Sequence, residues 1–251
     1  MPITFITGAT SGFGKAAAEK FAANGHALII NGRREDRLQA LSNKLQEQYH
    51  VAVLPLVFDV RDQQAVFNAV QGLSAEWQQI DILVNNAGLA AGRDFFNEAD
   101  LNDWNTMVDT NIKGFMYVAQ AVSKLMVPLK KGHIINIGSI AGKQVYEKGN
   151  VYCATKHAVD ALNQAMRIDL LRHNIRVTAI HPGAAETEFS LVRLKGDAKA
   201  ASEVYTGMKA LTAEDIAETI YWTTTLPPHV CVNDMIVTCV QQADAFYYNR
   251  V

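Results

Sequence analysis

The chain opens with a glycine-rich turn, Thr7-Gly8-Ala9-Thr10-Ser11-Gly12-Phe13-Gly14, which follows the apolar run Ile3–Ile6 and leads into a helical pattern. Glycine lets a backbone turn sharply and approach a phosphate, while the free N–H groups at a helix N-terminus attract negative charge. The spacing is Gly-x-x-x-Gly-x-Gly, which differs from the common Gly-x-Gly-x-x-Gly fingerprint. A tight turn without a ligand is one interpretation, but the strand before it and the helix after it favour a nucleotide site.

Short apolar runs alternate with helical patterns along the chain. Runs typical of strands buried on both faces are Ile3–Ile6, Ala27–Ile30, Val51–Phe58, Ile82–Val84, Ile134–Ile137, Arg176–Ile180 and Met235–Cys239. Helical spacing covers Lys15–Ala23, Arg37–Gln48, Gln63–Leu73, Trp104–Leu125, Tyr152–Arg172 and Ala213–Thr224. This alternation predicts βαβ units wound onto one parallel sheet, and no linker divides the chain. We therefore expect a single α/β domain over residues 1–251.

The composition argues against several classes of protein. The 251 residues carry 23 Lys and Arg against 25 Asp and Glu, so the basic excess of a nucleic-acid binder is missing. Three cysteines without a Cys-x-x-Cys spacing disfavour a disulfide framework and suit a reducing cytoplasm. The histidines show no metal-ligand spacing, so we expect no metal and interpret His157 and His181 as structural. Without a basic leader or a long apolar segment, we expect a soluble protein that contacts no membrane.

The second expected strand ends in Asn31-Gly32-Arg33-Arg34, where an Asp or Glu would bind the 2′-hydroxyl of NAD. Guanidinium groups suit a 2′-phosphate instead, so Arg33 and Arg34 favour NADP, with solvated loop charge as the alternative. Asp59 ends the third strand. It either accepts a hydrogen bond from the adenine amino group or caps the helix that starts near Asp62.

Ser139 ends the fifth expected strand, and further along the chain Tyr152 and Lys156 lie one helical turn apart. A free tyrosine, with a pKa of about 10, is a poor base at neutral pH. A cation one turn away favours the phenolate, so we expect Lys156 to lower the pKa of Tyr152 toward the range where acid–base catalysis works best. An ordinary amphipathic helix is the alternative, and the glycine-rich turn at the same end of the sheet disfavours it.

The connection between His181 and Leu211 is long, mixed in polarity and only weakly helical in its middle. Connections of this length near the carboxyl ends of parallel strands are often lids over a ligand. We expect a substrate lid at about residues 186–210, hereafter the lid segment, with a solvated surface helix as the alternative.

Several motifs occur together in order: Thr7-Gly8-x3-Gly12-x-Gly14, Asn85-Asn86-Ala87-Gly88, Asn111, Ser139, Tyr152-x3-Lys156 and Pro182-Gly183. The set resembles the short-chain dehydrogenase/reductase family over the full length of the chain. The resemblance implies a doubly wound Rossmann sheet of seven strands and hydride transfer between a nicotinamide and a carbinol carbon. It implies that Tyr152 exchanges the proton, while Lys156 lowers its pKa and holds the ribose. Ser139 would position the carbonyl, and Asn111 would complete a proton path to solvent.

The same resemblance implies an NADP site. Its expected residues are Gly8, Thr10, Ser11, Gly12, Phe13, Gly14, Arg33, Arg34, Asp59, Val60, Asn86, Ala87, Gly88, Tyr152, Lys156, Pro182, Gly183, Ala184 and Thr187. His181 departs from the Asn that many members carry before Pro-Gly, and Phe13 replaces an aliphatic residue. Phe13, with Glu188–Asp197 and Leu226–Val230, resembles the bacterial NADP-dependent 3-hydroxy acid dehydrogenases, which act on serine, allo-threonine or malonic semialdehyde. A carbonyl reductase of broad range and a non-catalytic NADP(H) sensor are the alternatives.

A 3-hydroxy acid brings a carboxylate, whose burial must be compensated when the lid closes. The candidate partners are Arg193 and Lys195 in the lid, with Lys143 and Gln144 just past Ser139. We favour Arg193, because a planar guanidinium can hold both carboxylate oxygens, and include Gln144 as a second substrate residue. A solvated lid arginine is the alternative.

The helix expected at Tyr152–Arg172 carries two apolar stripes, more than one sheet face needs, which predicts a partner helix. The family resemblance implies a homotetramer whose contacts are formed by this helix and the one near Thr110–Leu125.

Overall fold

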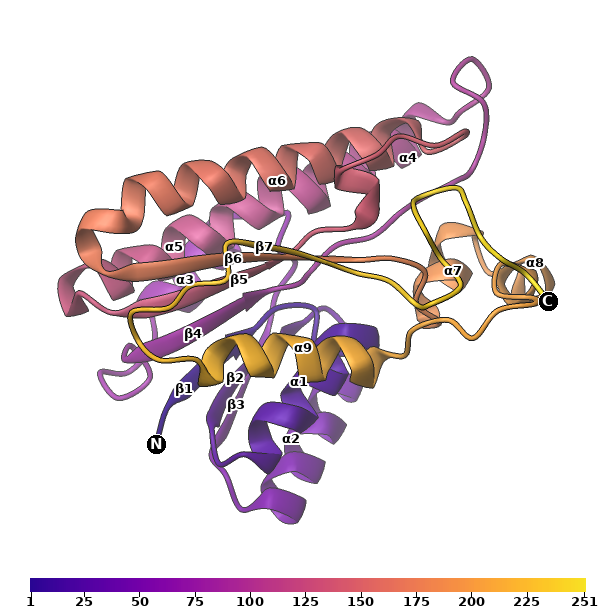
Figure 1. The fold of residues 1–251 in the computed structure, drawn as a ribbon. Coiled ribbons are helices and arrows are strands. Elements are labelled where there is room, and N and C mark those ends of the chain that lie inside the picture. The colour runs from indigo at the N-terminus through magenta and orange to yellow at the C-terminus, as the bar shows by residue number, and fades with distance from the viewer.

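A parallel sheet of seven strands, in the order β3-β2-β1-β4-β5-β6-β7, runs through the computed structural model, which describes residues 1–251 (Figure 1). The strands are β1 Ile3–Ile6, β2 Ala27–Gly32, β3 Val53–Val57, β4 Ile80–Asn85, β5 Gly132–Ile137, β6 Ile175–Pro182 and β7 Asp234–Val237. The strand order changes direction between β1 and β4, and such a switch point opens a crevice at the carboxyl ends of the strands. The predicted α/β class with a doubly wound parallel sheet is confirmed.

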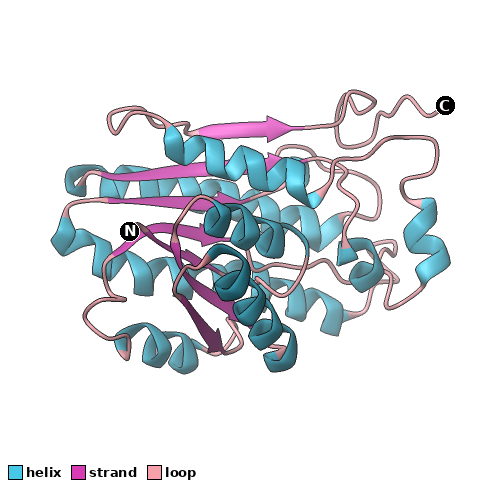
Figure 2. Ribbon diagram, turned by 90° about the horizontal axis from the view of Figure 1, so that it is seen from below, coloured by secondary structure: helices cyan, strands magenta, loops and turns pink.

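Helices cover both faces of this sheet, as Figures 1 and 2 show. The longer ones are α1 Gly12–Ala23, α2 Glu35–Tyr49, α3 Gln63–Gln71, α5 Phe115–Leu129, α6 Asn150–Leu170 and α9 Ala213–Thr225. α1, α2 and α9 pack on one face, while α3, α5 and α6 pack on the other. Neighbouring side chains of β1 alternate between the two apolar layers, with Ile6 in the first and Phe5 in the second. Because both faces are covered, the strand sequences are apolar almost without interruption.

The helix expected at Trp104–Leu125 is divided in the structure. α4 spans Leu101–Val108, a wider π-helical turn spans Asp109–Gly114, and α5 follows. The turn lets Asn111 reach back to the backbone of Leu89, and π-turns inside helices often mark functional sites. The prediction of one continuous helix was therefore wrong.

The lid segment holds two short helices, α7 Glu188–Arg193 and α8 Ala198–Glu203. After β7 the last residues, 238–251, fold back over the lid, and we call them the tail. The Arg250 guanidinium donates to the Val204 carbonyl at 3.0 Å, and the Val251 amide donates to the Gly207 carbonyl at 2.9 Å. Figure 1 places the C-terminus beside α8. None of the helices combines the length and the apolar character needed to span a membrane.

Candidate active site

A cavity of about 970 Å³ lies at the carboxyl ends of the strands. It brings together residues that are far apart in the sequence, and 20 of the 23 expected site residues line it: Gly8, Thr10, Ser11, Gly12, Phe13, Arg33, Arg34, Asp59, Val60, Asn86, Ala87, Gly88, Ser139, Tyr152, Lys156, Pro182, Gly183, Ala184, Thr187 and Arg193. Gly14, Asn111 and Gln144 do not line it. The sequence motifs therefore converge on one site.

The glycine-rich turn is shaped by positions that only glycine fits. Gly8 and Gly12 have φ values of +66° and +51°, in the left-handed region. A Cβ on Gly14 would overlap the Gly8 carbonyl, so its absence allows α1 to start close to β1. The Asn86 side chain joins the turn to the end of β4 by donating to the Thr7 carbonyl at 2.8 Å. A closely packed turn at a helix N-terminus, opening onto a large cavity, fits the pyrophosphate of a dinucleotide.

At one end of the cavity, Asp59 lies among arginines. Its carboxylate contacts the Arg33 guanidinium at 3.6 Å and the Arg61 guanidinium at 2.6 Å. Burial alone would raise the pKa of Asp59, but the hydrogen bonds from Arg61 and the charges of both arginines hold it below its ordinary value. Asp62 is the residue that caps α3, by accepting from the Ala65 amide at 3.0 Å. The capping role considered for Asp59 is therefore wrong.

Arg34 connects the glycine-rich turn to the lid. Its Nη2 atom donates to the hydroxyls of Thr10 at 2.9 Å and Ser11 at 3.1 Å, and its Nη1 atom lies 3.4 Å from a carboxylate oxygen of Glu188. Arg37 holds the same carboxylate at 3.1 Å. Glu188 is the first residue of α7, so an ion pair fastens the lid to the region expected to receive a 2′-phosphate. The sequence had given no reason to select Arg37.

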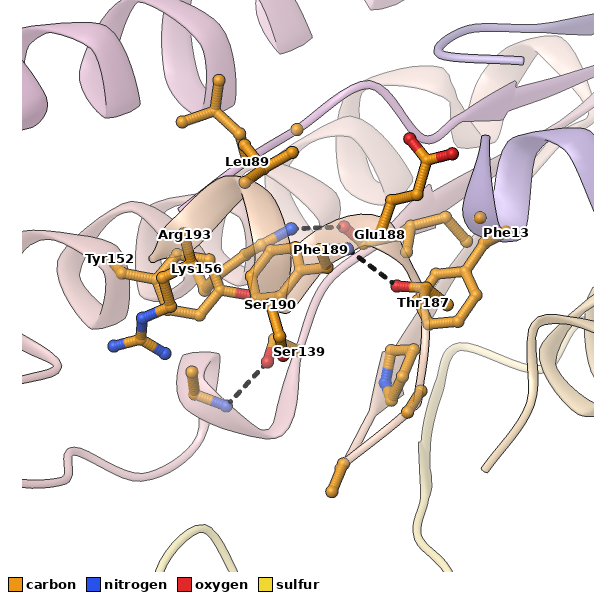
Figure 3. A pocket seen from close by; sticks show the side chains of 18 of the residues that line it. Phe13, Leu89, Ser139, Tyr152, Lys156, Thr187, Glu188, Phe189, Ser190 and Arg193 are labelled. Carbon is orange, nitrogen blue, oxygen red and sulfur yellow. Dashed lines mark hydrogen bonds between the residues drawn. The ribbon is translucent and has the colours of Figure 1, made fainter. Parts of the chain in front are cut away.

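Tyr152 and Lys156 lie on α6, and Ser139 faces them from the end of β5 (Figure 3). Both α6 side chains are buried, at 7% exposure each. The Lys156 Nζ atom donates to the Ile137 carbonyl at 3.0 Å and lies 6.0 Å from the centre of the Tyr152 ring. The short turn after Ser139 packs directly on α6, because a Cβ on Gly142 would fall 2.5 Å from the Lys156 carbonyl. This close approach fixes Ser139 relative to Tyr152.

Burial is the main cause of the pKa shifts of both Tyr152 and Lys156. Burial raises the pKa of Tyr152 above 10, and the hydrogen bond with Ser139 and the charge of Arg193 oppose it without reversing it. Burial lowers the pKa of Lys156 to about 8. The expectation that Lys156 brings the pKa of Tyr152 down is thus not met, because removing the phenolate from water outweighs the nearby charges. At neutral pH Tyr152 keeps its proton and most Lys156 side chains are charged.

Asn111 lies behind the cavity wall. Its amide donates to the Leu89 carbonyl at 2.7 Å and to the Thr155 hydroxyl at 3.1 Å, and its oxygen accepts from the Leu89 amide at 2.9 Å. A Cβ on Gly88 would lie 3.2 Å from that oxygen. Asn111 therefore ties the segment after β4 to α6, and its part in a proton path stays a prediction.

Of the four residues considered for a substrate carboxylate, only Arg193 lines the cavity. Lys195 pairs with Asp103 at 2.8 Å, and Lys143 pairs with Asp160 at 2.9 Å. Gln144 instead accepts from the Ala245 amide of the tail at 2.8 Å. The lysine charges are therefore neutralised elsewhere.

Arg193 lies beside Tyr152, and Phe189 of the same helix covers the tyrosine ring, as Figure 3 shows. Its guanidinium carbon is 5.6 Å from the centre of the Tyr152 ring and 5.5 Å from that of Tyr146. The guanidinium donates only to neutral oxygens: the Tyr146 hydroxyl at 2.9 Å and the carbonyls of Gly92 and Lys148. A positive charge without an acidic partner thus stands next to the expected proton donor.

Residues of the tail also line the cavity, and the sequence did not point to them. They are Gln242, Ala245, Phe246, Tyr248 and Arg250. The Gln242 side chain accepts from the Ala184 amide at 2.7 Å, beside Pro182-Gly183. No turn motif or periodic pattern marks these positions, because single side-chain contacts leave no repeat in the sequence.

The arrangement of turn, sheet end, tyrosine and lysine is that of a nucleotide-linked oxidoreductase. The chain belongs to the short chain dehydrogenase family, whose model matches residues 2–195. It is 47% identical to the NADP-dependent 3-hydroxy acid dehydrogenase YdfG of Salmonella typhi, over 97% of both chains. It is 46% identical to a sulfoacetaldehyde reductase of Chromohalobacter salexigens, over 95% of this chain and 94% of the relative. Among solved structures, the closed form of serine dehydrogenase complexed with NADP+ matches with a TM-score of 0.92 and 44% identity, over 99% of each chain.

Proposed function

We propose that the protein is an NADP-dependent dehydrogenase of small 3-hydroxy acids such as serine, allo-threonine and 3-hydroxypropionate, which also reduces malonic semialdehyde. The observation that carries the proposal is the unneutralised guanidinium of Arg193 beside Tyr152. A carboxylate held there would place the carbinol carbon of a three-carbon acid near the tyrosine hydroxyl and Ser139. The similarity to a 3-hydroxy acid dehydrogenase and to serine dehydrogenase supports this substrate class.

The residues of the cavity have separate tasks in this reaction. The glycine-rich turn would hold the pyrophosphate of NADP, Arg33 and Arg34 its 2′-phosphate, and Lys156 its nicotinamide ribose. When bound, the nicotinamide supplies or accepts the hydride. Tyr152 holds the transferable proton on its hydroxyl, and its raised pKa favours the protonated form that the reduction of a carbonyl requires.

Two further groups orient the substrate and exclude water. The Ser139 hydroxyl lies at the end of β5 and would donate to the substrate oxygen. Phe189, whose ring centre is 5.6 Å from that of Tyr152, shields the reacting atoms when the lid is closed.

A sulfonate is the second candidate for the acidic group, and the sulfoacetaldehyde reductase relative favours it. In 2-hydroxyethanesulfonate and in 3-hydroxypropionate, one methylene separates the carbinol carbon from the anionic group. A guanidinium donates to either anion, so the structure of the cavity suits both. Comparing kcat/KM for malonic semialdehyde and sulfoacetaldehyde, with NADPH at saturation, decides between them.

Arg193→Ala tests the acid specificity. We expect KM for serine or 3-hydroxypropionate to rise at least about 10-fold, while kcat/KM for a neutral alcohol changes little, because a charge-assisted hydrogen bond contributes about 1.5–3 kcal/mol. Lys195→Ala is the matched control, since this lid cation pairs with Asp103 outside the cavity. Proportional changes for acid and neutral substrates would contradict the proposal and favour a carbonyl reductase of broad range.

We also propose a homotetramer in the cytoplasm. Exposed apolar side chains on α5, on α6 and directly after α6 support an assembly: Met116, Ile168 and Leu171 are 37%, 73% and 72% exposed. The three free cysteines suit a reducing compartment. Sedimentation at micromolar concentration tests the assembly, and a stable monomer would refute it.

A further inference from the structure

His181 is a fully buried titratable residue for which the reaction described above has no task. It lies in β6, immediately before Pro182, and its side chain is 0% exposed. Its ring rests against Gly138, where a Cβ would fall 2.6 Å from the ring atom Cε1. Only glycine at position 138 lets the imidazole approach the end of β5, from which Ser139 extends.

One ring nitrogen of His181 contacts the backbone of Ser139. Nδ1 lies 3.1 Å from the Ser139 carbonyl oxygen and 3.4 Å from the Ser139 amide nitrogen. With a proton, Nδ1 donates to the carbonyl, and without one it accepts from the amide. Its protonation therefore selects which backbone group of Ser139 is held.

The other ring nitrogen faces a charged cluster contributed by three segments: Lys143 after the turn at Ser139, Asp160 of α6 and Asp234 of β7. Nε2 makes no hydrogen bond, but it lies 3.4 Å from Asp234 Oδ2 and 3.7 Å from Asp160 Oδ1. The Lys143 ammonium binds the same two oxygens at 2.5 Å and 2.9 Å. His181 and the two carboxylates are near enough to hold a metal ion, but the ammonium already supplies the cation between them.

We propose that His181 is a positioning residue for Ser139, and that the Lys143–Asp160–Asp234 cluster determines which ring nitrogen carries the proton. Two carboxylate oxygens next to Nε2 attract a proton there and repel a bare lone pair. The neutral ring is therefore protonated on Nε2, and Nδ1 accepts from the Ser139 amide. A second proton, on Nδ1, turns the ring into a donor to the Ser139 carbonyl and displaces the hydroxyl that orients the substrate.

The proposal predicts that kcat depends on pH, and the groups around His181 determine the direction of this dependence. Burial and the charge of Lys143 lower the pKa of His181, whereas Asp234, Asp160 and the Ser139 carbonyl raise it, with a net lowering below 6.5. At neutral pH the ring is uncharged and Ser139 is in place. As the pH falls below the pKa of His181, kcat declines.

The pH profile of kcat, measured with any carbonyl substrate the enzyme reduces, tests this role. His181→Asn should lose the acid limb, because asparagine does not titrate. Asp234→Asn should move the limb about one pH unit lower, and Lys143→Met should move it about one unit higher, because each removes a charge that acts on the ring. His26→Asn is the control: His26 is also buried and has a lowered pKa, but it binds Thr4 at the opposite end of the sheet.

A second measurement keeps the test independent of turnover and of the proposed substrate, although the catalytic task of Ser139 belongs to the proposed function. The ¹⁵N spectrum of the histidine-labelled enzyme should show the His181 ring protonated on Nε2 at neutral pH, with the signal assigned by its loss in His181→Asn. A proton on Nδ1 at neutral pH would overturn the proposal. An unchanged acid limb in His181→Asn, or limbs that move the same way in Asp234→Asn and Lys143→Met, would also overturn it.

Discussion

The glycine-rich turn and the lid line the same cavity, but they are built in opposite ways. The turn is fixed by backbone geometry, with two glycines at positive φ and a third at the close approach of α1 and β1. The lid is held by individual side chains, among them Arg193 on the Tyr146 hydroxyl and Glu188 on two arginines. Ser190 is the only buried residue of α7 and α8. Backbone geometry that only glycine fits leaves a short motif of fixed spacing in the sequence, whereas individual side-chain contacts follow no such spacing. A segment with few buried residues also opens at a lower cost in free energy than a closely packed turn.

If chemistry belongs to the rigid part of the site, removing one atom there should have the largest effect. Tyr152→Phe should lower kcat about a thousandfold while the Kd for NADPH stays within about twofold, because only the transferable proton is lost. Tyr146→Phe is the matched control, since it removes the hydroxyl of a neighbouring tyrosine and should keep most of kcat. Retention of more than about a tenth of kcat by the Tyr152 variant would end the assignment.

Cofactor selection at the end of β2 should have the next largest effect. Replacing Arg33 and Arg34 by Gln should raise KM for NADP at least about 10-fold per arginine and change KM for NAD little, because each charge-assisted bond contributes about 1.5–3 kcal/mol. Lys44→Gln, which removes an exposed cation that pairs with Glu19, controls for net charge. Equal changes for both cofactors would mean that the two arginines do not contact the 2′-phosphate.

The rigid part of the site also contains a residue, Lys156, that lowers the stability of the fold. Burial lowers the pKa of Lys156 to about 8, so keeping this cation in the fold costs free energy at neutral pH. Lys156→Met should abolish turnover and raise the free energy of unfolding by about 1–2 kcal/mol at pH 7, after allowance for the lost bond to Ile137.

The sign of the pH effect follows from linkage. Between pH 8 and the ordinary lysine pKa of about 10.5, the unfolded chain binds more protons than the fold, so the wild type gains stability as pH rises. The advantage of the variant should therefore shrink over that window. Urea unfolding at pH 7 and pH 10 measures the difference in free energy of unfolding between the variant and the wild type. A variant that is less stable than the wild type at pH 7 would contradict the prediction.

The same contrast explains how far the sequence could predict the molecule. β1 was placed at Ile3–Ile6 without error, and β5 and α6 within two residues at each end, because buried strands and long amphipathic helices carry a periodic signal. The residues expected to bind the cofactor, Gly14 excepted, line one cavity, and the turn among them could be selected because it has a local motif.

Three features of the structure could not be predicted, because no local sequence pattern marks them. The π-turn at Asp109–Gly114 depends on contacts of Asn111 with Leu89, which is distant in sequence. The raised pKa of Tyr152 depends on burial that only the folded lid and sheet produce. The tail reaches the cavity through side chains that follow no period, such as Gln242 on the Ala184 amide.

The smallest predicted effect is a change in KM for NADP, and it comes from Glu188, where the lid meets the glycine-rich turn. Glu188 presents a carboxylate to Arg34 and Arg37. At Arg34 it therefore competes with a 2′-phosphate for the guanidinium. Because these ion pairs are largely exposed, they contribute at most about 1 kcal/mol. Glu188→Gln should therefore lower KM for NADP about two- to fourfold, leave KM for NAD unchanged, and lose its effect in high salt.

Glu186→Gln is the control for this variant, because Glu186 is an exposed carboxylate two residues earlier in the chain. Competition requires the effect to be confined to the cofactor that carries the phosphate. If Glu188→Gln instead raised KM for both cofactors, the main role of the carboxylate would be to hold the lid against the glycine-rich turn through its ion pairs with Arg34 and Arg37. The first residue of α7 would then belong to the cofactor site. The boundary between the rigid cofactor region and the movable substrate region would lie within α7, after Glu188.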